Sequence, residues 1–114
     1  MYKMTILFKK ATAERAALIE HRWATEFLPL AEQMPGVVRL SLARVFGEPS
    51  GASSYDRLHE FYFATDADLD AALSSPVGIK AGQVLLQFAA DLVTVLFSEV
   101  FEENVPSMDA SLHA

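Results

Sequence analysis

The sequence predicts an α+β fold with the element order β-α-β-β-α-β. Alternation of apolar and polar residues marks four strands, and apolar residues at helical spacing fill the stretches between the first and second strands and between the third and fourth. The strands are expected at residues 2–9, 37–46, 57–64 and 92–101. This order is that of the ferredoxin-like arrangement, a four-stranded antiparallel sheet with both helices on one face.

A long amphipathic helix is expected after the first strand. Thr12 is a suitable N-cap, and Glu14 lies in the first turn, where a negative charge interacts favourably with the helix dipole. Pro29 removes one backbone donor, so we expect a kink around it, and Pro35-Gly36 ends the helix. At about 100° per residue one broad apolar face results, made of Ala16, Ile19, Trp23, Ala24, Phe27, Leu30, Ala31 and Met34.

Turn residues divide the second half of the chain. Residues 47–54 are rich in Gly, Pro and Ser and are expected to form a mobile loop between the second and third strands. Thr65 is expected to cap a short helix that ends at Ser75-Pro76. A further helical piece, weakened by two glycines, is expected over residues 77–90.

The composition limits the classes of protein to which the chain can belong. Residues 1–101 are expected to form one domain, followed by a loose tail at residues 102–114. No apolar run approaches the roughly 18 residues of a membrane span, so we expect a cytoplasmic protein that does not enter a membrane. The net charge of −6 and the scattered Lys and Arg argue against a nucleic-acid partner. Without cysteine, a metal-binding histidine spacing or a glycine-rich phosphate motif, no metal and no cofactor are expected.

Both faces of the predicted sheet carry apolar side chains, but helices can cover only one of them. At about 25 cal/mol per Å², leaving the second face in water would forfeit several kcal/mol, which is comparable with the stability of a small domain. We therefore expect a homodimer that packs through the sheet faces. The first strand carries Met4, Ile6 and Phe8 on one side and Leu7 on the other. The third strand carries Phe61 and Phe63 on one side and Leu58 and Tyr62 on the other.

Two titratable residues are candidates for a catalytic role. Glu20 interrupts the apolar helix face one turn before Trp23, where a carboxylate must be paired, neutralised or open to a wet pocket. In a pocket it would act as a general acid or base; alternatively, it reaches the edge and pairs with a lysine or arginine. His59 shares a strand face with Phe61 and Phe63. If that face meets the helices, its imidazole can exchange protons in the pocket; alternatively, it is a core or interface histidine.

Other residues are candidates for supporting roles. Glu60 lies on the opposite strand face, where an interface salt bridge with Arg39 or Arg44 is expected, and His21 is expected to face solvent. Five aromatic side chains are candidates for the walls of a ligand pocket, although their spacing also suits a plain core. They are Trp23, Phe27, Tyr62, Phe63 and Phe88.

Several motifs occur together in this chain: the opening strand MYKMTILFKK, W-x5-PL-x4-PG from Trp23 to Gly36, the strand HEFYF, the helix end AALSSP, and Phe88. With these motifs, which span nearly all of residues 1–101, the chain resembles the EthD-type proteins of the dimeric α+β barrel superfamily. The resemblance implies a dimer with a hydrophobic pocket between sheet and helices in each subunit.

Three positions depart from the pattern of many EthD-type proteins. Phe27 stands where many carry a helix histidine, Val84 where many carry an acidic residue, and Leu40 where many carry an aromatic side chain. An apolar side chain cannot move a proton, so chemistry that depends on that histidine cannot be transferred to this chain.

Two functions are therefore expected as alternatives. The first is a cofactorless dehydratase or isomerase that holds a small apolar or aromatic metabolite while Glu20 or His59 moves a proton. The resemblance implies a degradation or biosynthetic pathway, because relatives are associated with ether degradation and with dehydration of aromatic polyketides. The second is a non-catalytic small-molecule-binding or accessory protein, which the apolar residue at Phe27 favours.

Overall fold

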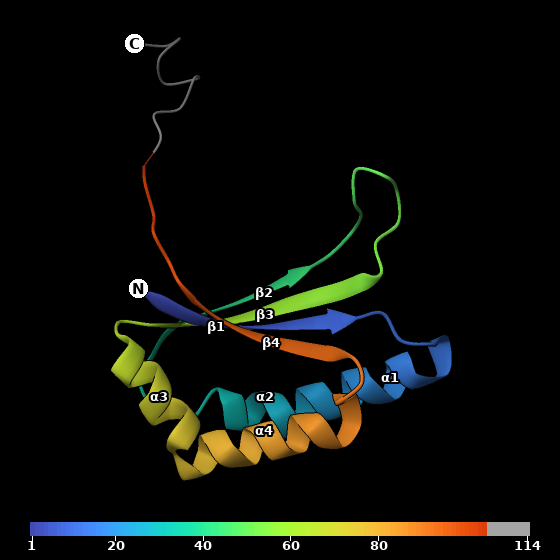
Figure 1. Cartoon of the computed structure of the whole chain (residues 1–114). Coiled ribbons are helices and arrows are strands. Elements are labelled where there is room, and N and C mark those ends of the chain that lie inside the picture. Colours follow the sequence, from blue (N-terminus) through green and yellow to red (C-terminus); the bar gives the residue numbers. More distant parts are fainter. Residues whose placement is uncertain (105–114) are drawn as a thin grey trace.

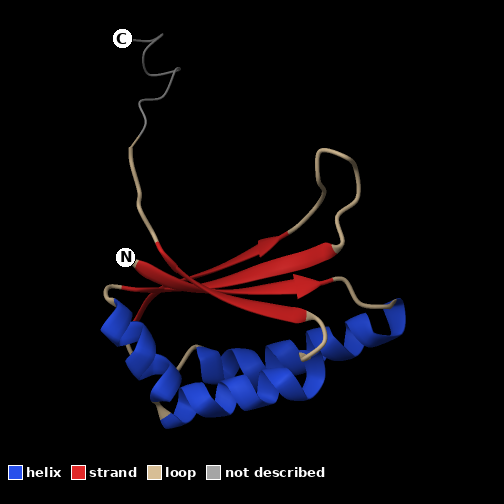
Figure 2. Cartoon of the chain, viewed as in Figure 1, coloured by secondary structure: helices blue, strands red, loops and turns tan. Residues whose placement is uncertain are grey.

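The chain forms one antiparallel sheet with helices on one face, as seen in the computed structural model, which describes residues 1–104 (Figure 1). The strand order is β2-β3-β1-β4. Figure 2 shows the two layers, the sheet and the helices, and confirms the predicted ferredoxin-like α+β fold. The elements are β1 (Tyr2–Lys9), α1 (Ala13–Arg22), the π-helix η1 (Trp23–Phe27), α2 (Leu28–Ala31), β2 (Val37–Arg44), β3 (Tyr55–Phe63), α3 (Asp66–Ser74), α4 (Pro76–Ala89) and β4 (Val93–Glu99).

The predicted helix caps are present. The Thr12 hydroxyl accepts from the Arg15 backbone N–H, and the Thr65 hydroxyl accepts from that of Asp68. At the start of α4, Ser75 accepts from the Gly78 N–H at 3.1 Å. These local bonds fix where α1, α3 and α4 begin.

The long first helix is interrupted earlier than expected. Its irregular turn is η1, which precedes Pro29 and in which the Leu28 N–H donates to the Trp23 carbonyl. Pro29 then stands in the first turn of α2, where its missing N–H is tolerated. Both ends of η1, Trp23 and Phe27, are buried against the sheet. Single π turns of this kind often occur at functional sites.

Strand bounds shift by a few residues from those expected. β2 ends at Arg44 and β3 already begins at Tyr55, because Tyr55 pairs with Lys9 of β1. The expected mobile loop between them contains a closed turn in which Glu48 and Gly51 exchange two backbone hydrogen bonds of 2.7 and 2.9 Å. Gly51 has φ +125°, a conformation that favours glycine. Of the expected tail, residues 105–114 lie outside the described residues.

The core lies between the helices and the central strands β1 and β3. The strand face that carries His59, Phe61 and Phe63 meets the helices. The edge strands are less well covered, because Leu42, which pairs with His59, is 50% exposed and Phe97, which pairs with Met4, is 60% exposed. Within residues 1–104, no helix is long and apolar enough to cross a bilayer.

Candidate functional site

His59 lies in an aromatic enclosure between the sheet and the helices. It is 2% exposed, and its ring centroid lies 4.3 Å from that of Phe61, 5.5 Å from that of Trp23 and 6.2 Å from that of Phe27. Burial, reinforced by the nearby positive charge of Arg57, lowers the pKa of His59 from 6.5 to about 4. The imidazole is therefore neutral at pH 7.

Two buried polar atoms of the enclosure have no hydrogen-bond partner among the described residues. They are Nδ1 of His59 and Nε1 of Trp23, contributed by β3 and by η1. Leaving a buried polar group unpaired costs about 1–3 kcal/mol. Such a cost is unusual inside a small core and marks the place where a ligand would find ready polar partners.

An apolar cavity of about 140 Å³ lies next to the enclosure. Phe27 belongs to both, since its ring faces His59 and also lines the cavity. At the β4 edge the cavity is bordered by the half-exposed side chains of Val95 and Phe97. The remaining lining residues are Met4, Ile6, Met34, Leu73, Gly78, Ala81, Gly82 and Leu85.

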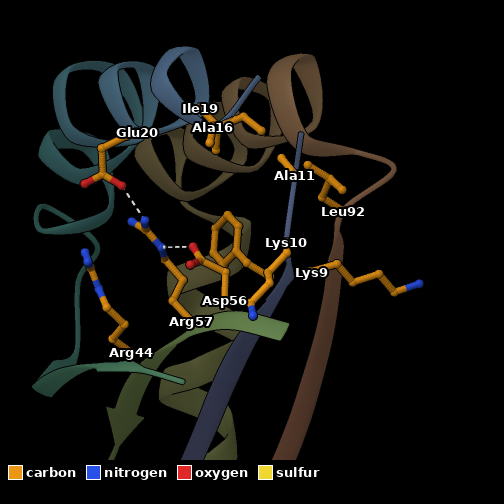
Figure 3. A pocket seen from close by; sticks show the side chains of 11 residues that line it. Lys9, Lys10, Ala11, Ala16, Ile19, Glu20, Arg44, Asp56, Arg57 and Leu92 are labelled. Atoms are coloured by element: carbon orange, nitrogen blue, oxygen red, sulfur yellow. Dashed lines mark hydrogen bonds and ion pairs between the residues drawn. The ribbon is translucent and has the colours of Figure 1, made fainter. Parts of the chain in front are cut away.

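Glu20 lies outside this apolar region. Its carboxylate forms an ion pair with Arg57, whose guanidinium also donates to Asp56 at 2.8 Å (Figure 3). The Glu20 side chain is 49% exposed and borders a separate, charged cleft of about 470 Å³. The edge position and arginine partner are those of the alternative that the sequence left open.

The five candidate wall residues are divided between different environments. Trp23 and Phe27 enclose His59, whereas Phe63 is packed in the core and Phe88 lies on α4 beneath the guanidinium of Arg22. Tyr62 lies on the other sheet face, where the Arg39 guanidinium stacks over its ring at 4.0 Å. Of the five candidate wall residues, Phe27 alone lines the apolar cavity formed by the described residues.

Several cavity residues were not singled out as site candidates in the sequence. Met4 and Ile6 line the cavity from β1, and Ala81 and Leu85 line it from α4. Met4 and Ile6 share the strand face of Phe8, and Ala81 and Leu85 lie four residues apart on one helix face. Those patterns mark both pairs as core, and nothing local in them distinguishes a cavity wall.

Two further predictions concern charged side chains. Glu60 does lie on the face opposite His59, where it pairs with Lys3 of the same chain at 2.6 Å. The interface pairing expected with Arg39 or Arg44 stays a prediction. Lys3 lies beside Glu60 because Thr5 is the direct pairing partner and Lys3 is the diagonal neighbour on the same face. His21 is exposed, as expected.

No three His, Asp or Glu side chains in residues 1–104 are grouped closely enough to hold a metal ion.

Fold and site together define a small ferredoxin-like α+β protein with an apolar interior site beside a buried histidine. No family model matches the chain. A relative from Rhodococcus erythropolis, an uncharacterized 11.0 kDa protein in the thcB-thcC intergenic region, is 32% identical over 105 residues. The match covers 92% of this chain and 98% of the relative. The chain belongs to the family of this Rhodococcus protein.

Solved structures support the same fold. An EthD (ethyl tert-butyl ether d) family protein from Bacillus halodurans C-125 superimposes with a TM-score of 0.81 at 24% identity, covering 89% of this chain and 99% of that one. A dimeric ferredoxin-like protein of unknown function from Jannaschia sp. CCS1 has a TM-score of 0.64 at 21% identity, covering 87% of this chain and 98% of that one. The EthD resemblance found in the sequence is thereby confirmed as a structural relation.

Proposed function

We propose that the chain binds a small apolar molecule with one polar group between the sheet and the helices. The supporting observation is the pair of unpartnered buried atoms, Trp23 Nε1 and His59 Nδ1. A ligand hydroxyl placed there would accept from the indole N–H and donate to Nδ1 of the neutral imidazole, which would offset the cost of burying both nitrogens.

The cavity sets the size of this ligand. An apolar cavity of about 150 Å³ holds a molecule the size of benzene, and the volume here is about 140 Å³. Phe27 stands between the cavity and His59. A single substituted ring fits the cavity, with its polar substituent directed past Phe27 toward the imidazole.

Catalysis by His59 is the second candidate function, favoured by the neutral state of its unpartnered nitrogen. In an isomerisation, Nδ1 would take a proton from one ligand carbon and return it to another; in a dehydration, the proton would leave with hydroxide as water. No external oxidant or reductant is needed. Binding is the better-supported role, because a base whose pKa is about 4 is weak at pH 7.

Glu20 remains the other proposed proton-transfer group. Its ion pair with Arg57 directs it toward the charged cleft, away from the apolar cavity. A role for Glu20 would therefore require a ligand that extends from the cavity past Trp23.

Assembly as a homodimer through the open sheet face is part of the proposal. That face carries Leu7, Leu58 and the half-exposed Leu96, whose register partner on β1 is Thr5. The similar Jannaschia protein is described as dimeric. Packing two such faces together would remove these leucines from water.

Native mass spectrometry of freshly purified protein, compared with the denatured sample, tests both parts of the proposal. A dimer that carries extra small-molecule mass is the expected result. A monomer without added mass, under conditions that preserve known dimers, would contradict it.

Variants then test whether the apolar cavity binds a ligand without the two titratable side chains. Binding of toluene, followed by calorimetry, is expected to survive Glu20→Gln combined with His59→Gln and to fail in Phe27→Trp, whose larger ring fills the cavity. Loss of toluene binding in the double variant, with the fold intact by circular dichroism, would overturn the assignment of the cavity as the binding element.

A further inference from the structure

A second cavity, the charged cleft beside α1, has a composition that the interior site does not explain. It is bordered by four cationic side chains, Lys9, Lys10, Arg44 and Arg57, and by two carboxylates, Glu20 and Asp56. This excess of positive charge is found in a chain whose net charge is −6. The cleft shares no lining residue with the apolar cavity.

Two of the arginines are placed directly opposite each other. Arg44 of β2 and Arg57 of β3 are register partners, so their side chains leave the same face of the sheet. Like charges at such positions destabilise a strand pair. Both carboxylates of the cleft are used by Arg57, and their hydrogen bonds outweigh burial and raise its pKa.

Arg44 and Lys10 keep their charges available. Neither forms an ion pair with any residue in the described range 1–104. In Figure 3 the guanidinium of Arg44 points toward the Glu20 side of the cleft, whereas Lys9 extends away from the other side chains. Because Glu20 and Asp56 offset the charge of Arg57, the uncompensated positive charge of the cleft lies at Arg44 and Lys10.

The remaining walls are apolar. Phe8 and Ile19 are buried side chains of the core that also border the cleft, and Leu92 closes its other side. A volume of about 470 Å³ lies within the usual range for small-molecule sites. The walls thus suit a ligand with an anionic end and an apolar body.

We propose that this cleft binds small organic carboxylates, with the carboxylate on Arg44 and the apolar body against Phe8 and Ile19. A guanidinium presents paired donors that match the two oxygens of a carboxylate. Binding there would also offset the repulsion between Arg44 and Arg57.

Trp23 provides the readout, because it is the single tryptophan and the Arg57 guanidinium lies 5.2 Å from its ring. Benzoate and its uncharged analogue benzamide are titrated at low salt, with fluorescence confirmed by calorimetry. Benzoate is expected to bind about tenfold more tightly than benzamide, and its affinity should fall as added salt screens the cleft.

Arg44→Gln is expected to weaken benzoate binding about tenfold and to leave benzamide binding unchanged. Lys80→Gln, the same loss of charge at an exposed position of α4, is the matched control and should change neither. Equal affinities for benzoate and benzamide, or unchanged benzoate affinity in Arg44→Gln, would overturn the proposal. The toluene experiment is independent of this result because the two cavities share no lining residue.

Discussion

At the scale of single residues, the burial of His59 links its chemistry to the pH dependence of folding. The pKa of folded His59 is about 4, against 6.5 in the unfolded chain. Between these values the unfolded state binds a proton that the folded state does not, so stability falls as the pH is lowered through this window. The free energy of unfolding is expected to decrease by about 2 kcal/mol from pH 7 to pH 5 through this residue.

His59→Gln should remove that part of the pH dependence, as measured by urea denaturation at both pH values. His21→Gln, the same substitution at an exposed position of α1, is the matched control. If wild type and His59→Gln lost the same stability on acidification, the imidazole would not be held neutral by burial.

How far the candidate site could be predicted also depends on single residues. The sequence placed His59, Phe61 and Phe63 on one strand face, but periodicity does not say which face meets the helices. The sequence allowed Glu20 to lie either in a pocket or in an ion pair at the edge. Its ion-pair partner, Arg57, is 37 positions away in the chain, so local patterns could not decide between the two. The unpartnered nitrogen of Trp23 follows from packing against β3 and has no local signal.

At the scale of elements, the contact between α3 and α4 depends on Gly78. A Cβ on Gly78 would lie 2.0 Å from the carbonyl oxygen of Ala72 at the end of α3. Gly78→Ala is therefore expected to destabilise the protein by about 1–3 kcal/mol, although alanine ordinarily favours a helix over glycine. The midpoint of urea denaturation measures the effect.

Gly82 on the same helix is the matched position, since a Cβ there meets nothing within 4 Å. Gly82→Ala should stabilise the protein by about 0.5–1 kcal/mol. If Gly78→Ala instead stabilised the protein, α3 and α4 could move apart without loss of stability.

The elements themselves were largely predictable because their signals are local. Thr12, Thr65 and Ser75 cap the helices that their positions predict, and the alternation of apolar residues locates all four strands. The π-helix was not predictable, because Pro29 indicates a break without specifying which turn widens. Strand ends also shifted, since they depend on partners elsewhere in the sheet.

At the scale of the whole molecule, the open face of the sheet is expected to be the dimer contact. Leu96→Glu places a charge on that face and should convert the dimer to a monomer, as measured by sedimentation equilibrium. Leu86→Glu is the matched control, because Leu86 of α4 is 56% exposed and Leu96 is 50% exposed. A dimer that tolerates Leu96→Glu, or dissociates with Leu86→Glu, would place the contact elsewhere.

The strand order has a consequence for how the chain emerges from the ribosome. β1 is made first, yet it lies between β3 and β4, so that Tyr2 pairs with both Phe63 and Glu99. The nascent chain therefore carries Met4, Ile6 and Phe8 without a complete sheet around them until almost the whole chain has been synthesised. A chain stalled before residue 93 would expose an unpaired edge of its central strand, the kind of surface that promotes aggregation.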